Sequence, residues 1–196
     1  MTRNWCLPLI LLAACGTTKI GRYEFSSYSI AAPKGDWGVV KLNEAAEEIQ
    51  FASARPDDMG KIVQTTLMGV SKVSVAASEA ELTEEALVDQ FFTRELRTQE
   101  EALKAAKNYS FKEVRKGVAT VGGKKVYFTG YGVDMGGSSA GGTNGDALHY
   151  VYFPPDWKTR RAFYDFGVSQ VWREGGPNVL RDLKVVEPLV AGFATR

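Results

Sequence analysis

Cysteine is almost missing from this chain of 196 residues. Its two cysteines, Cys6 and Cys15, both lie within the first fifteen residues. A domain that begins after Cys15 therefore contains no thiol, which excludes a structural disulfide, a thiolate metal site and a cysteine nucleophile together. Such a domain suits an oxidising compartment.

An excess of charge of either sign is also missing. Lys and Arg total 24, Asp and Glu total 23, and the net charge is +1. Residues 1–14 carry one charged side chain, Arg3, so the rest of the chain is balanced. A balanced chain offers no basic field for nucleic acid, and no nucleic-acid partner is expected. Balance also makes attraction to anionic lipid headgroups a poor explanation for membrane binding.

A long apolar run is absent, because the apolar block at residues 5–12 is far shorter than the ~20 residues that cross a bilayer. The block follows Arg3 and leads into Leu12-Ala13-Ala14-Cys15. A charged start, an apolar core and small residues before a cleavage point are the parts of a secretory signal. A short buried helix and a plain secretory signal are the alternatives.

The segment Leu12-Ala13-Ala14-Cys15 resembles the lipobox of bacterial lipoproteins. The resemblance implies that residues 1–14 are a signal peptide and that Cys15 is acylated, with palmitate or a similar chain, so that lipid anchors the protein in the cell envelope. Gly16 after the cysteine resembles the sorting pattern for the outer membrane of enteric bacteria, on its periplasmic face. The expected division is a signal peptide at 1–14, a lipidated cysteine and tether at 15–27, and a single globular α+β domain at 28–196.

The clearest helix is expected at residues 83–107. Thr83 can cap its amino end, and the next two residues are acidic, as the helix dipole favours. Its apolar stripe should face a sheet, and its opposite face, with Glu95, Arg97, Glu101 and Lys104, should face solvent. Strands are expected at residues 39–42, 49–52, 62–75, 109–121, 125–134, 147–153 and 162–172, with a hairpin at Gly122-Gly123 and one apolar face on the last strand. A closing helix is expected from Gly175 to Phe193, which Pro188 should kink or end.

This order of elements resembles the PsbP-like superfamily. The residues that carry the resemblance are Tyr28-Ser29-Ile30, Pro33-Lys34-Gly35-Asp36-Trp37, the central helix and the closing helix after Trp172. The resemblance implies a mostly antiparallel sheet covered by helices, an α/β/α sandwich. Relatives of this kind, which include photosystem extrinsic subunits, a Ran-binding factor and bacterial lipoproteins, mostly bind other proteins. No catalytic residue carries over to a position in this chain.

A glycine-rich loop spans residues 136–143. It has the spacing of a phosphate-binding Walker A loop, but Gly142 stands where that loop needs its lysine, and a strand rather than a helix follows. A loop that orders on a protein partner is the preferred interpretation, with Gly136, Gly141 and Asn144 as contact residues.

His149 is the only histidine. A packed core histidine on the face of Val151 is the simpler interpretation. The alternative is an envelope enzyme or small-ligand binder with a site near Asp134, Asp146 and His149. A triad of His149 with a loop serine lacks the Gly-x-Ser-x-Gly elbow. A metal site lacks enough ligands at recognisable spacing, and neither metal nor cofactor is expected.

Trp157 lies in a turn beside Arg160 and Arg161. An exposed tryptophan between cations would be an interface anchor, whereas a tryptophan folded over its own turn would be structural. Without a catalytic motif, the sequence favours a non-catalytic, membrane-anchored accessory domain that binds an envelope protein.

Overall fold

The computed structural model describes residues 21–196 except 57, 61, 104–109, 135–143 and 173–185. The helices are α1 (Glu84–Leu103), α2 (Trp157–Arg160) and α3 (Glu187–Ala191), with a 3₁₀ turn at Ala77–Glu79. The strands are β1 (Arg22–Glu24), β2 (Tyr28–Ala31), β3 (Gly38–Asn43), β4 (Glu48–Pro56), β5 (Ile62–Ser74), β6 (Ser110–Val121), β7 (Lys124–Asp134), β8 (Asn144–Tyr152), β9 (Ala162–Trp172) and β10 (Phe193–Thr195).

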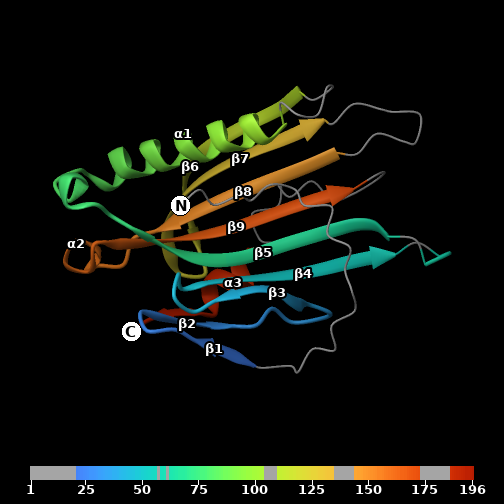
Figure 1. The fold of residues 1–196 in the computed structure, drawn as a ribbon, viewed down its shortest axis with the longest axis horizontal. Coiled ribbons are helices and arrows are strands. Elements are labelled where there is room, and N and C mark those ends of the chain that lie inside the picture. The colour runs from blue at the N-terminus through green and yellow to red at the C-terminus, as the bar shows by residue number, and fades with distance from the viewer. Residues whose placement is uncertain (1–20, 57, 61, 104–109, 135–143, 173–185) are drawn as a thin grey trace.

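The described strands form two sheets. A seven-stranded sheet has the order β3-β4-β5-β9-β8-β7-β6, and a small sheet has the order β1-β2-β10. Every strand pair in both sheets is antiparallel. The expected fold class, α+β with a mostly antiparallel sheet, is therefore confirmed (Figure 1).

One face of the large sheet, which we call the aromatic face, packs on the small sheet and α3. Ile49, Val70, Phe166 and Tyr150 form one register row across four strands of this face, and all four are fully buried. Phe193 of β10 packs against Phe166, with ring centroids 5.1 Å apart. A small sheet and a helix together cover this face, where the sequence suggested helices alone. The other members of this core include Tyr28, Ile30, Phe51, Leu148, Tyr164, Leu189 and Val190.

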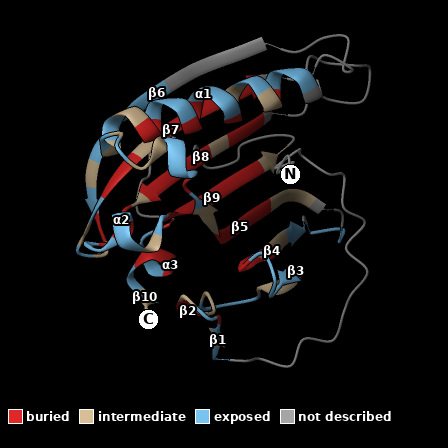
Figure 2. Ribbon diagram, turned by 60° about the vertical axis from the view of Figure 1, so that its left-hand side comes forward, coloured by how far each residue is buried: buried red, intermediate tan, exposed pale blue. Residues whose placement is uncertain are grey.

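The opposite face, which we call the helix face, is covered by α1 over β7, β8 and β9. The cap is as expected, because the backbone N–H of Ala86 donates to the Thr83 hydroxyl over 3.2 Å. The apolar stripe of α1 lies on a cluster from these strands, and Figure 2 shows buried and exposed residues alternating along the helix. The predicted extension to residue 107 falls outside the described residues. The cluster contains Leu87, Val88, Phe91, Phe92, Tyr127, Val151, Phe153 and Phe163.

The predicted hairpin at Gly122-Gly123 is confirmed. Both glycines have positive φ, +54° and +76°, and they join β6 to β7. A Cβ on Gly122 would lie 2.7 Å from the backbone nitrogen of Ala191, so glycine there also lets α3 approach the turn.

Two expectations about the chain ends are wrong. The predicted tether is too long, because Arg22–Glu24 already pairs with β2 and Tyr23 packs on Phe51, with ring centroids 5.6 Å apart. Pro188 stands in the first turn of α3 instead of ending a helix, because that position needs no N–H, and Phe193 lies in β10. β9 has the predicted apolar face, and its other face is buried as well up to Gln170, because this strand is covered on both sides.

Candidate functional site

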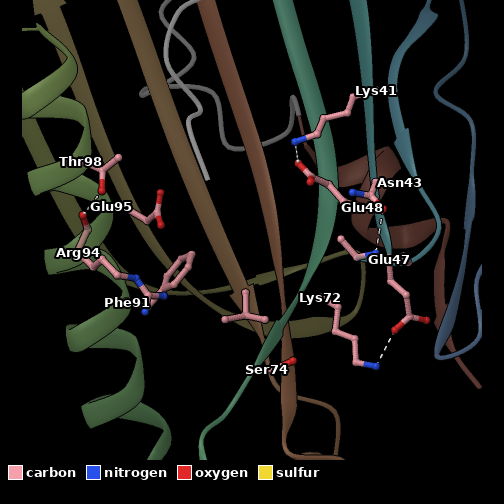
Figure 3. A pocket seen from close by; sticks show the side chains of 13 residues that line it. Lys41, Asn43, Glu47, Glu48, Lys72, Ser74, Phe91, Arg94, Glu95 and Thr98 are labelled. Carbon is pink, nitrogen blue, oxygen red and sulfur yellow. Dashed lines mark hydrogen bonds and ion pairs between the residues drawn. The ribbon is translucent and has the colours of Figure 1, made fainter. Parts of the chain in front are cut away.

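A cleft of about 840 Å³ runs between α1 and the neighbouring part of the sheet (Figure 3). Phe91, Arg94 and Thr98 line it from α1, while Lys72 and Val73 line it from β5. The β3–β4 turn closes the far side. The cleft lies beside α1, which covers β7 to β9, on the side of β5 and the β3–β4 turn. We call it the α1–β5 cleft.

The far wall of the α1–β5 cleft neutralises its own charges. Lys41 Nζ lies 2.8 Å from Glu48 Oε1, and Lys72 Nζ lies 2.6 Å from Glu47 Oε2. Arg94, on the helix side, is exposed, and its guanidinium carbon lies 5.6 Å from the Phe91 ring centroid. No carboxylate of the described residues lies within ion-pair distance of Arg94. The cleft therefore presents one uncompensated cation beside an aromatic ring.

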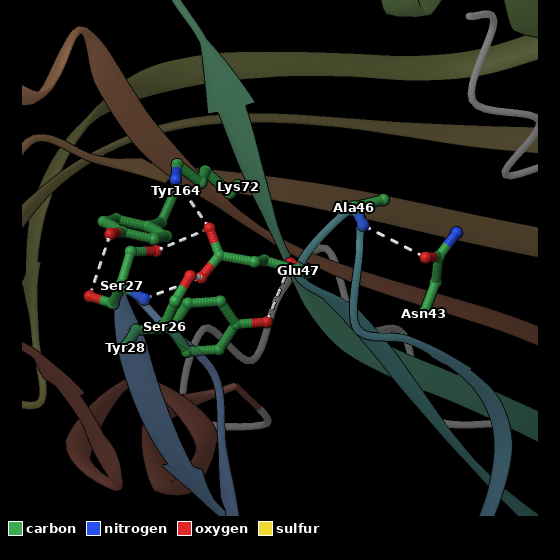
Figure 4. A network of polar contacts seen from close by, with 8 residues as sticks. All are labelled: Ser26, Ser27, Tyr28, Asn43, Ala46, Glu47, Lys72 and Tyr164. Atoms are coloured by element: carbon green, nitrogen blue, oxygen red, sulfur yellow. Dashed lines mark hydrogen bonds and ion pairs between the residues drawn. The ribbon is translucent and has the colours of Figure 1, made fainter.

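Glu47 anchors the far wall to the small sheet (Figure 4). Its carboxylate accepts hydrogen bonds from the Ser26 hydroxyl over 2.7 Å, from the backbone N–H and hydroxyl of Ser27 over 2.6 and 2.9 Å, and from Lys72. The Tyr28 hydroxyl donates to the Glu47 carbonyl over 2.9 Å. Burial raises the pKa of Glu47, but these donors outweigh burial and lower the pKa to about 2. The turn at the cleft is thus rigidly tied.

A buried ionisable pair lies under α1, beside the cleft. His149 Nδ1 on β8 donates to both oxygens of Asp165 on β9, each over 3.2 Å, and the side chains are 2% and 0% exposed. Burial alone would lower the pKa of His149, but the carboxylate of Asp165, helped by that of Glu95 on α1, raises it above the ordinary value. The Phe91 ring packs edge-on against His149, with centroids 6.2 Å apart.

The interface between α1 and the helix face also contains polar atoms that lack a partner. Gln99 Nε2 on α1 and Thr129 Oγ1 on β7 are buried and have no hydrogen-bond partner among the described residues. Each such group costs about 1–3 kcal/mol. The interface is therefore polar and less stable than its burial would suggest.

His149 is the packed histidine that the sequence favoured, but the predicted cluster with Asp146 does not form. The two residues are three positions apart on β8, so their side chains leave opposite faces of the sheet. Asp146 stands in register with Gln170 on the aromatic face. Asp134 is in register with Asn144, and the structure does not describe its side chain.

Sequence patterns did not place two buried carboxylates, Asp165 and Glu95, under the helix. Asp165 alternates with Tyr164 and Phe166, so period two places it on the second face of β9, to which the sequence patterns assigned no role. Glu95 was assigned to the solvated side of its helix, and it is 4% exposed and faces the sheet. The assignment was wrong because the stripe of α1 is wide enough to bury a carboxylate beside the only histidine.

The predicted partner-binding residues are dispersed. Trp157 is 6% exposed and packs on Phe153, with ring centroids 5.2 Å apart, so the exposed anchor is wrong and the tryptophan folds over its turn. Arg160 pairs with Asp156 over 2.6 Å, and Arg161 is exposed. Asn144 lies at the start of β8, paired with Trp172 of β9. Cys15, Gly136 and Gly141 lie outside the described residues.

No protein-family model matches the chain, and no curated protein is similar to it. Among solved structures, the chain is similar to the solution structure of cyanobacterial PsbP (CyanoP) from Synechocystis sp. PCC 6803, with 14% identity, a TM-score of 0.45, and coverage of 94% of this chain and 99% of that one. That protein belongs to the group that the sequence resembles, and a likeness of this degree carries no inference about activity. In the described part of the chain, no helix is long and apolar enough to span a bilayer. No cluster of three or more potential metal ligands occurs among the same residues.

Proposed function

We propose that this chain is a lipid-anchored accessory domain of the bacterial cell envelope that binds a protein segment in the α1–β5 cleft. The order Leu12-Ala13-Ala14-Cys15 supports the anchor. The single observation that supports binding is the cleft itself, with its self-neutralised far wall and the uncompensated Arg94 opposite. The binding is non-catalytic.

The charge of the cleft specifies the chemistry of the bound segment. Since Lys41 and Lys72 are already paired with carboxylates, Arg94 is the group that gains most from an incoming anion. A guanidinium binds a carboxylate through two parallel hydrogen bonds, which fixes its orientation. Phe91 and Val73 supply apolar contact next to it. The fitting partner is a segment that carries Asp or Glu beside an apolar side chain.

Site-specific crosslinking in intact cells tests the binding. A photoreactive residue replaces Thr98, which lines the cleft. We expect a reproducible crosslink to one envelope protein, at a peptide that contains Asp or Glu. Arg94→Ala should reduce the yield about tenfold, because a charge-assisted hydrogen bond contributes about 1.5–3 kcal/mol.

The matched control is Arg97→Ala on the same helix. Arg97 is exposed and pairs with Glu101 over 3.0 Å, so its loss removes an equal charge from outside the cleft. We expect an unchanged yield for this variant. An Arg94→Ala yield equal to that of Arg97→Ala would show that the cleft is not the binding site.

Intact-mass spectrometry of the membrane fraction tests the anchor. We expect a chain that begins at an acylated Cys15. Full-length protein in the cytosol, with Met1 in place and an unmodified thiol at Cys15, would refute it.

A further inference from the structure

The two outermost strands of the large sheet are β3 and β6 (Figure 1). Each pairs with a single neighbour, and no other strand of the described residues lies against its outer edge. Such an edge presents unpaired backbone N–H and C=O groups to which another strand can bind. The two edges of this sheet differ in how well they are protected from such pairing.

The edge at β3 is protected. This strand has six residues, and a bulge between Val39 and Lys41 interrupts its register with β4. Lys41 is exposed at this edge and pairs with Glu48. Short length, a bulge and a lysine are all features that block pairing at an edge. β3 is therefore a poor template for a further strand.

The edge at β6 is open. This strand has twelve residues, and its register with β7 is regular from Glu113 to Val121. Val118, which is 55% exposed, is the most exposed large apolar side chain in the described strands. A long and regular edge with an exposed apolar side chain is typical of a strand that pairs with another chain.

The hairpin turn decides which backbone groups of β6 point outward. The turn has two residues, Gly122-Gly123, both with positive φ, so the two residues that flank it exchange both of their backbone hydrogen bonds. Hydrogen-bonded and non-hydrogen-bonded pairs alternate from there along the two strands. The N–H and C=O groups of Lys116, Val118 and Thr120 therefore point away from β7.

We propose that β6 pairs with β6 of a second copy of this chain, antiparallel about a two-fold axis at Val118, so that one continuous sheet runs through a homodimer. Val118 then lies opposite Val118 of the second copy, and Lys116 lies opposite Thr120 of the second copy. Both pairs use the outward backbone groups. On the aromatic face, Gly117 lies opposite Ala119, and Arg115 lies opposite Val121.

Charge and apolar contact select this register. An axis at Lys116 would set two ammonium groups opposite each other, which destabilises a strand pair. Axes at positions 117, 119 and 120 would set Val118 opposite Lys116, Thr120 and Gly122. The axis at Val118 places no like charges opposite each other and covers the exposed valine with its own copy.

The charge of Lys116 does not oppose the approach of a second copy. Lys116 Nζ lies 3.6 Å from Asp89 Oδ1 on α1, so the lysine is compensated within its own chain. Both side chains are exposed and keep contact with water. The β6 edge also lies apart from the α1–β5 cleft, because none of the described β6 residues lines that cleft. The dimer therefore does not rest on the proposed function.

Hydrogen exchange of the full-length, untagged chain, followed by NMR at each amide, tests the strand pairing. We expect protection at residues 116, 118 and 120 to rise about fourfold across about a hundredfold range of concentration centred on the dissociation constant, as mass action requires. Residues 117 and 119 bond to β7 and should not change. A profile that stays flat at all three outward amides up to about 1 mM, the limit of weak association, would overturn the proposal.

Sedimentation equilibrium of Val118→Lys tests the position of the axis. We expect the dissociation constant of the dimer to rise at least about tenfold, because both copies lose a covered valine and two ammonium groups face each other. Leu42→Lys on β3 is the matched control, since Leu42 is 49% exposed, and it should leave the constant unchanged. Both sites are exposed, so neither variant should unfold the chain. Equal constants for the two variants contradict an axis at Val118.

Val118→Cys tests the pairing in intact cells. The two α carbons on the axis would be about 5.5 Å apart, a separation that a disulfide spans. After treatment with a mild oxidant, we expect a disulfide that joins two copies at position 118, identified by mass spectrometry of the linked peptide. Identification at the peptide distinguishes this bond from any bond at Cys6 or Cys15. Leu42→Cys should give no bond between copies at position 42.

Two further outcomes of the Val118→Cys experiment are decisive. A disulfide from position 118 to a different protein, with none between copies, overturns the second copy as the occupant of this edge. Loss of the dimer with an intact Thr98 crosslink refutes this inference alone. A dimer without any Thr98 crosslink refutes the proposed function alone.

Discussion

On the aromatic face of the large sheet, residues from four strands form a fully buried apolar row, and the small sheet and α3 cover this face. On the helix face, β7, β8 and β9 present Thr129, His149 and Asp165 to α1, and the α1–β5 cleft lies beside them. Successive side chains of each strand point to opposite faces of the sheet, so the two faces share one backbone and differ only in their side chains. This difference indicates that the aromatic face provides the stability, whereas the helix face buries polar groups at a cost in stability.

The largest effect should come from truncating the aromatic face. Phe166 is fully buried and packs on Phe193, so Phe166→Ala should lower the free energy of unfolding by about 3–5 kcal/mol. Leu42, which is 49% exposed on the edge strand β3, is the control. Leu42→Ala should change the free energy of unfolding by less than about 0.5 kcal/mol. Urea denaturation measures both. Similar values for the two variants would contradict the assignment of stability to this face.

The hairpin turn separates backbone strain from the docking of α3. Gly122→Ala and Gly123→Ala both place a side chain at positive φ, which costs about 1–2 kcal/mol. Only a Cβ at Gly122 meets Ala191, whereas a Cβ at Gly123 has nothing within 4 Å. Gly122→Ala should therefore destabilise the chain by about 1 kcal/mol more than Gly123→Ala. Equal thermal unfolding midpoints for Gly122→Ala and Gly123→Ala would mean that α3 moves away from a Cβ at residue 122 without a cost in stability.

Opposite pH dependences should distinguish the two sides of the molecule. The folded pKa of Glu47 is about 2, below its unfolded value, so its stabilisation is present above pH ~4.5 and is lost as pH falls toward 2. His149 loses its stabilisation in the opposite direction, as pH rises. Glu47→Gln should be about 2 kcal/mol less stable than the unmodified chain at pH 6, and this gap should close near pH 2. A constant gap in urea denaturation across this range would contradict the assignment.

The smallest expected effect is a gain in stability, whereas the preceding variants lose stability. Because the Thr129 hydroxyl is buried without a partner among the described residues, Thr129→Val should stabilise the chain by about 1 kcal/mol. Val70→Thr is the matched reversal on the aromatic face, where a hydroxyl would enter an apolar row, and it should destabilise by about 2 kcal/mol. If Thr129→Val destabilises instead, the helix face is optimised for stability.

Local rules were sufficient for much of the framework. The strands around Gly122-Gly123 followed from period two and a turn that needs positive φ, and the start of α1 followed from Thr83. The same local rules failed near the carboxyl end of the chain, where spacing alone suggested a helix through Phe193. Burial against Tyr28 and Phe166 selects a strand there instead, and such distant contacts leave no mark on local periodicity.

The sequence by itself determined the antiparallel sheet, the amphipathic helix and the lack of thiol chemistry after Cys15, because each depends on neighbouring residues or on composition. Tertiary structure alone decided that His149 and Asp165 meet under α1, that Glu95 is buried, and that Asp146 leaves the other face of the sheet. It also decided that α1 stops short of β5 and leaves a cleft. Those outcomes depend on which strands a helix covers, which is set by the packing of surfaces far apart along the chain.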